Sequence, residues 1–132
     1  MPTERIPTGE QEAVSTVIIV QDDFIEAERL RVLLEQAGYR VPGIAGRTVD
    51  AGRLAARAEA ALAIVDMMLE VDVDGIHTAT ELARRYALKI LITTGFPDAV
   101  IHAEDVAGLA CAIVKKPYTD AEILAAVARC LA

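Results

Sequence analysis

The sequence is poor in aromatic residues and in positive charge. It has no Trp, three Tyr and two Phe, and its 13 Lys and Arg are outnumbered by 20 Asp and Glu, which gives a formal net charge of −7. Proteins that bind nucleic acids neutralise phosphates with basic patches and stack bases on aromatic rings. No basic cluster interrupts the acidic composition, so we do not expect this chain alone to bind nucleic acid.

Cysteine is also scarce. Cys111 and Cys130 are the only two, and neither a CxxC motif nor His/Cys ligand spacing accompanies them. This favours buried, reduced thiols over a disulfide or a zinc site.

The first fourteen residues lack the apolar stretch that a signal peptide or a membrane span needs. We therefore expect a cytoplasmic protein with no membrane contact. Residues 1–14 are interpreted as a flexible leader because they contain two Pro, a Gly and several polar residues. At 132 residues and 54% apolar, the chain fits one compact domain, predicted over residues 15–132.

Short apolar runs, too brief for buried helices, predict strands of a parallel sheet that is covered on both faces. They are Val17–Val20, Leu62–Val65, Ile90–Ile92 and Cys111–Val114. A weaker fifth run, Arg40 to Ala45, contains Pro42, which favours an edge strand.

Segments with helical spacing separate these runs. Apolar stripes are formed by Ala27, Leu30, Leu34 and Ala37, by Ile76, Ala79, Ala83 and Tyr86, and by Ile123, Val127 and Leu131. Two weaker helices are predicted over 54–60 and 98–106. The alternation predicts a doubly wound α/β fold, (βα)5, with a five-stranded parallel sheet.

Polar residues follow the predicted strands at the carboxyl edge of the sheet, where open α/β folds place their ligand crevice. They are Gln21, Asp22 and Asp23 after the first strand, Asp66 after the third, Thr93 and Thr94 at the fourth, and Lys115 and Lys116 at the last. If the strands take the flavodoxin-like order 2-1-3-4-5, the first and third strands are neighbours, and Asp22 and Asp66 project into one crevice.

Two neighbouring carboxylates repel unless a cation lies between them, and oxygen ligands without His or Cys favour Mg²⁺. The predicted site combines a carboxylate nucleophile, a metal, a hydroxyl and an ammonium. These groups meet the needs of phosphoryl transfer, which are positioning and neutralisation of the phosphoryl oxygens.

In this order and spacing, Asp22, Asp66, Thr94 and Lys116-Pro117 resemble the motifs of the response regulator receiver family, from about Thr16 to the C-terminus. The resemblance implies that Asp66 is phosphorylated and that Asp22, Asp66 and the backbone carbonyl of Met68 hold Mg²⁺ or Mn²⁺. It further implies that Thr94 and Lys116 bind phosphoryl oxygens and that a cis peptide bond precedes Pro117.

The resemblance also implies a role in two-component phosphorelay signalling. A histidine kinase or a histidine phosphotransfer protein would supply the phosphoryl group. The chain would catalyse its own phosphorylation and dephosphorylation and would not turn over a separate substrate. We expect no effector domain after Ala132 and therefore expect the output to be a change in contacts with a downstream protein.

The sequence departs from the family pattern at several positions. Gln21 stands where receivers usually carry an acidic residue that reaches the metal through water, and Ile113 stands where many carry a Tyr or Phe that moves on activation. The loop after Asp66 also lacks the usual proline. Gln21 and Ile113 favour an alternative function, a pseudo-receiver adaptor that binds partners regardless of phosphorylation, whereas Asp66, Thr94 and Lys116 oppose it.

Overall fold

The computed structural model describes residues 14–67, 75–95 and 108–132. In chain order the elements are β1 (Val17–Val20), α2 (Phe24–Gln36), β2 (Ile44–Ala45), α3 (Thr48–Ala58), β3 (Leu62–Asp66), α4 (Gly75–Tyr86), β4 (Lys89–Thr94), β5 (Ala110–Lys115) and α7 (Asp120–Leu131). The leader predicted over 1–14 lies almost wholly outside the described residues, as does the helix predicted over 98–106. No described helix is long and apolar enough to cross a bilayer.

The predicted α/β topology is confirmed. The strands form one parallel sheet in the order β2-β1-β3-β4-β5, so that β1 and β3 are neighbours. The central strands are buried along their whole length, as their unbroken apolar runs predicted. The run with Pro42 is an edge strand but is shorter than expected, because only Ile44 and Ala45 pair with β1 in a ladder.

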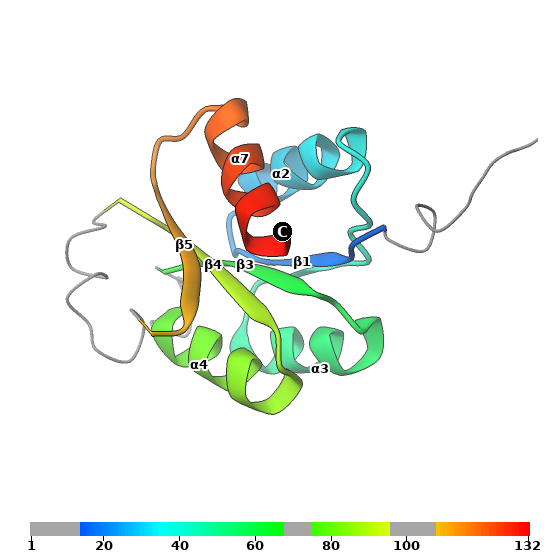
Figure 1. The fold of residues 1–132 in the computed structure, drawn as a ribbon. Helices are drawn as coiled ribbons and strands as arrows, with labels where there is room; N and C mark the ends of the chain where they lie inside the picture. The colour runs from blue at the N-terminus through cyan, green and yellow to red at the C-terminus, as the bar shows by residue number, and fades with distance from the viewer. Residues whose placement is uncertain (1–13, 68–74, 96–107) are drawn as a thin grey trace, which may run out of the picture.

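Helices cover both faces of the sheet, with α2 and α7 on one side and α3 and α4 on the other (Figure 1). Alternate strand residues supply the two cores. Ile18 and Val20 pack in the cluster that includes α3 and α4, whereas Val17 and Ile19 pack in the cluster that includes α2 and α7. This division fixes which helices adjoin each residue at the carboxyl edge.

Local signals set the helix ends. The Asp23 carboxylate caps α2 by accepting hydrogen bonds from the N–H groups of Ile25 and Glu26. The helix ends before Gly38, whose positive φ of 100° suits glycine. The predicted start of α7 at Thr119 is a capping box with Glu122. Ala37, placed on the buried stripe of α2 by its spacing, is instead the exposed residue after that helix.

The prediction of reduced cysteines is wrong. Cys111 and Cys130 form a disulfide that joins β5 to the last turn of α7, across 19 residues of sequence. Spacing could not indicate this pair, because the two residues are brought together only when α7 packs back on the edge of the sheet.

Candidate functional site

Asp66 is the last residue of β3 and lies in the interior of the carboxyl edge. Asp66 is only 5% exposed, and a lone carboxylate that is buried to this degree is costly to ionise. The Nζ of Lys116 compensates the charge by donating a hydrogen bond to Oδ2 of Asp66 at 2.9 Å. Asp66, the predicted phosphoryl acceptor, and Lys116, predicted to bind a phosphoryl oxygen, are therefore an ion pair.

Lys116 is held by the end of the neighbouring strand. Its N–H donates to the carbonyl of Thr94 at 2.7 Å, which extends the pairing of β4 with β5 by one residue. The Lys116–Pro117 peptide bond is cis, as the resemblance implied. The adjacent Lys115 is exposed, so that Lys116 is the lysine turned toward Asp66.

Asp22 follows β1, the strand beside β3, and is half-buried. Capping of α2 belongs to Asp23, so Asp22 is not the capping residue. The buried Gln21 accepts a hydrogen bond from the N–H of Asp23 through Oε1 at 3.0 Å. The amide that replaces an acidic residue here thus braces the turn in which Asp22 and Asp23 lie.

Thr93 and Thr94 are both buried at the end of β4. Thr93 pairs with Asp66 in the sheet and its carbonyl accepts from the N–H of Met67, whereas Thr94 lies one residue closer to the edge. The sheet therefore gathers Asp22, Asp66, Thr94 and Lys116 at one edge. Met68, the predicted carbonyl ligand, lies outside the described residues.

Gly75 is a site residue that the sequence analysis missed. It begins α4 and donates its N–H to the carbonyl of Met67 at 2.9 Å. A Cβ at this position would stand 2.2 Å from the carbonyl oxygen of Asp66, too close for any side chain. The helix start therefore packs directly on the backbone of the acceptor strand. A glycine directly before the predicted helical stripe that begins at Ile76 was the signal available.

Glu26 and Tyr118 were also missed. The Glu26 carboxylate in the first turn of α2 lies 3.7 Å from the Lys116 ammonium. Burial, with the negative charge of Glu26 as the next cause, raises the pKa of Tyr118 to about 12. Tyr118 follows Lys116-Pro117 directly, so these groups extend the site toward α2.

The residues present fit a hard divalent cation. Asp22 and Asp66 offer carboxylate oxygens from adjacent strands, and such oxygens are what Mg²⁺ prefers. Within residues 14–67, 75–95 and 108–132, no group of three or more His, Cys, Asp or Glu side chains is placed to hold a metal. A cation here would consequently rely on two carboxylates together with backbone, water or phosphoryl oxygens.

Comparison with known proteins agrees with this geometry. Residues 17–128 match the model of the response regulator receiver domain. The transcriptional regulatory protein PdtaR of Mycobacterium tuberculosis is 29% identical over 125 residues, which are 92% of this chain and 60% of PdtaR. The phyllosphere-induced regulator PhyR of Methylorubrum extorquens is 22% identical over 87% of this chain and 43% of that protein. The chain thus spans about half of these relatives.

Solved structures share the fold. The receiver domain of PhyR from Erythrobacter litoralis superposes with a TM-score of 0.81 at 17% identity and covers 92% of both chains. The receiver domain of a modulated diguanylate cyclase from Desulfovibrio desulfuricans gives a TM-score of 0.78 at 28% identity, over 89% of this chain and 94% of that one. With the family model matching most of its length, the chain belongs to the response regulator receiver domain family.

Proposed function

We propose that the chain accepts a phosphoryl group on Asp66 in a Mg²⁺- or Mn²⁺-dependent reaction and thereby changes its contacts with a downstream protein. The observation that supports this proposal most strongly is the buried Asp66 carboxylate paired with the Lys116 ammonium at 2.9 Å. Receiver domains are signalling domains and not turnover enzymes, so the phosphorylated chain is itself the product.

In the proposed step a carboxylate oxygen of Asp66 attacks the phosphorus of the donor. A P–O bond forms, the P–N bond to the donor histidine breaks, and the imidazole leaves with the electron pair and takes up a proton. The transferred group carries charge on its equatorial oxygens. Lys116 would move from the carboxylate to one of those oxygens, Thr94 would donate its hydroxyl to another, and Asp22 and Asp66 would hold the cation. When bound, the cation neutralises phosphoryl charge.

A protein donor needs a surface beside Asp66, and the chain offers an apolar groove there. The groove, about 960 Å³ in volume, lies between α2 and the segment that joins β5 to α7. Its lining includes Phe24, Ile25, Leu33, Lys116 and Tyr118. Phe24 and Ile25 are 71% and 77% exposed. Since Lys116 belongs to both the groove and the site, we propose this groove as the docking surface of the histidine kinase or phosphotransfer protein.

Labelling with a small donor tests the proposal without a partner. The protein is incubated with Mg²⁺ and acetyl phosphate, and its intact mass is measured. Wild type should gain one phosphoryl group, and Asp66→Ala should gain none. Lys116→Ala should label much more slowly than Lys115→Ala, its exposed neighbour and matched control. Equal labelling of wild type and Asp66→Ala would remove Asp66 as the acceptor, and chelation of the metal should abolish labelling.

A second function is a pseudo-receiver adaptor that binds partners without phosphorylation. Gln21 favours it, because its amide is committed to the N–H of Asp23 and supplies no charge toward a cation. An unlabelled wild type at saturating Mg²⁺ and acetyl phosphate would favour this function. We place it second because the Asp66–Lys116 pair is intact.

A further inference from the structure

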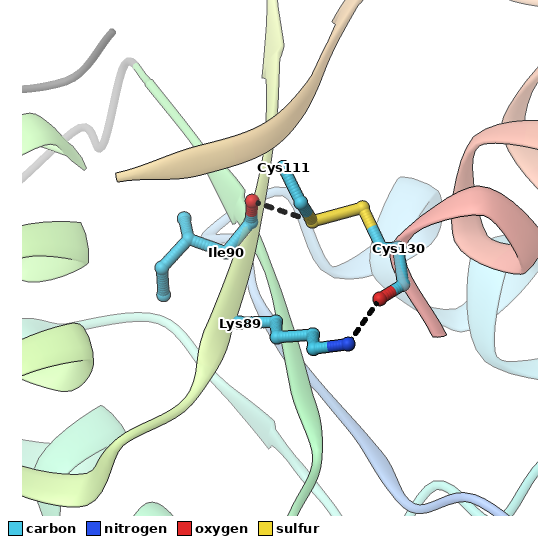
Figure 2. Close-up of a disulfide and its surroundings, with 4 residues drawn as sticks. All are labelled: Lys89, Ile90, Cys111 and Cys130. Atoms are coloured by element: carbon cyan, nitrogen blue, oxygen red, sulfur yellow. Dashed lines mark hydrogen bonds between the residues drawn. A yellow bond between two sulfur atoms is a disulfide. The ribbon is translucent and has the colours of Figure 1, made fainter. Parts of the chain in front are cut away.

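The Cys111–Cys130 disulfide joins an edge strand to the C-terminal helix (Figure 2). The two Cα atoms are 5.4 Å apart, which lies within the usual range for a disulfide. The ring closed by this bond contains Lys116 and Tyr118, and thus the whole connection between β5 and α7. The disulfide lies at the amino end of β5, and Lys116 directly follows the carboxyl end of the same strand.

A β-bulge places Cys111 on the side of α7. Ile90 pairs with Ala110 and Leu91 pairs with Ala112, so that Cys111 is the extra residue of β5. Ala110 and Ile113 pack with the cluster of α3 and α4, whereas Ala112 packs with the cluster of α2 and α7. In an unbulged strand Cys111 would face away from Ala112. The extra residue turns it to the same side, where Cys130 is buried.

The two sulfurs have different surroundings. Cys111 is exposed, whereas Cys130 is 4% exposed. The Sγ of Cys111 lies 3.1 Å from the carbonyl oxygen of Ile90, a position from which a reduced thiol donates a hydrogen bond (Figure 2). The Nζ of Lys89 donates to the carbonyl of Cys130 at 2.8 Å. An acceptor for one thiol is therefore in place for the reduced state, as is a cation bonded to the backbone of the residue that carries the other thiol.

We propose that Cys111 and Cys130 are a reversible redox site for a dithiol/disulfide carrier. A thiolate of the reduced carrier attacks the exposed Cys111 sulfur, the S–S bond breaks, and Cys130 leaves as a thiolate that takes up a proton. The second carrier thiol then attacks the first carrier sulfur, which is bonded to Cys111 in the mixed disulfide, and releases Cys111 as a thiol. Two electrons and two protons pass to the chain, and the carrier is left as a disulfide.

Lys89 is a positioning residue in this step. Exchange is faster when the leaving thiol is more acidic, and a neighbouring ammonium stabilises the thiolate. In the cytoplasm, where we expect this chain, thiols are kept reduced and disulfides are usually transient. The bond would therefore form by the reverse exchange, when the carrier is in its disulfide form, and would fix the end of α7 to β5. This inference is independent of phosphorylation at Asp66.

A redox titration of the full chain tests the proposal. The native protein is equilibrated in buffers of reduced and oxidised dithiothreitol, free thiols are alkylated after an acid quench, and intact mass counts them. We expect complete, reversible interconversion between a species with two thiols and one with none, without denaturant. Hydrogen exchange should become faster in the α7 amides on reduction, while the sheet stays protected.

Two results would overturn the proposal. A disulfide that resists dithiothreitol until the protein unfolds would be a fixed structural bond, and a reduced chain that does not reoxidise would hold no redox site. Lys89→Met should slow reduction several-fold, whereas Lys115→Met, an exposed lysine at the opposite end of the neighbouring strand β5, should not. Equal rates for both variants would remove Lys89 from the mechanism.

Discussion

At the scale of single residues, the site is governed by how Lys116 is shared. Its ammonium lies 2.9 Å from Asp66 and 3.7 Å from Glu26, so that the buried carboxylate holds it more closely. Glu26 offers a second position for the same ammonium. Phosphoryl transfer removes the negative charge of the Asp66 carboxylate. The nearby Glu26 carboxylate can then keep Lys116 within the site.

Tyr118 supplies a prediction at this scale through its pKa of about 12, raised by burial from the ordinary 10.0. A pKa raised by folding contributes stability that is fully present below the unfolded value and is lost as pH rises through the folded value. Wild type should therefore lose stability relative to Tyr118→Phe between pH 10 and about 12. Urea midpoints across that range, with the tyrosinate absorbance, measure the effect.

Tyr39→Phe is the matched control, since it retains Tyr118. This variant should keep the late-titrating phenol and the same loss of stability as wild type. A Tyr118→Phe variant whose midpoints parallel those of wild type from pH 9 to pH 12 would contradict the assignment of the raised pKa to Tyr118.

At the scale of elements, docking of the donor protein in the groove between α2 and the β5–α7 connection can be tested separately from phosphoryl transfer to Asp66. Phe24 and Ile25 are highly exposed, so truncating both should leave stability and acetyl phosphate labelling unchanged. Transfer from a phosphorylated histidine phosphotransfer protein should slow by roughly tenfold or more, because buried aromatic anchors carry much of the binding energy of interfaces. The rate of loss of phosphoryl from the donor measures this.

Val49→Ala controls for the loss of exposed apolar surface. Val49 is 58% exposed on α3, on the opposite face of the sheet. Transfer to this variant should match transfer to wild type. If Val49→Ala slows transfer as much as the double variant does, or if neither slows it, the groove is not the docking surface.

Element by element, the sequence predicted what periodicity and capping encode. The runs at Val17, Leu62 and Ile90 became strands because unbroken apolar residues suit a sheet buried on both faces. The run from Cys111 to Val114 became β5, but its bulge was not predictable, since an extra residue within an apolar run leaves the composition unchanged. The strand order, which is that of flavodoxin-like folds, was not fixed by periodicity and is given by the structure.

The site could be predicted only where its residues end strands. Asp66, Thr94 and Lys116 meet because the carboxyl ends of β3, β4 and β5 share one edge. Gly75 and Glu26 were missed because their roles depend on packing: a helix start against the Asp66 carbonyl, and a helix face turned to Lys116. The disulfide was missed for the same reason.

At the scale of the whole molecule, the disulfide is a constraint on the unfolded chain. Cross-linking residues 19 apart removes conformational freedom from the unfolded state, which is worth about 3 kcal/mol for a ring of this size. Domains are stable by only about 5–15 kcal/mol, so reduction should remove a substantial part of the free energy of unfolding. Denaturant titrations of the oxidised and reduced chain measure the difference.

The denaturant slope provides an independent check. An unfolded chain that keeps the ring exposes less surface, so the oxidised protein should show a smaller slope as well as a higher midpoint. Cys111→Ala and Cys130→Ala should each become insensitive to dithiothreitol. Of the two, Cys111→Ala should perturb packing less, because Cys111 is exposed and Cys130 is buried in the core shared by α2 and α7. Equal free energies of unfolding for oxidised and reduced wild type would contradict a stabilising cross-link.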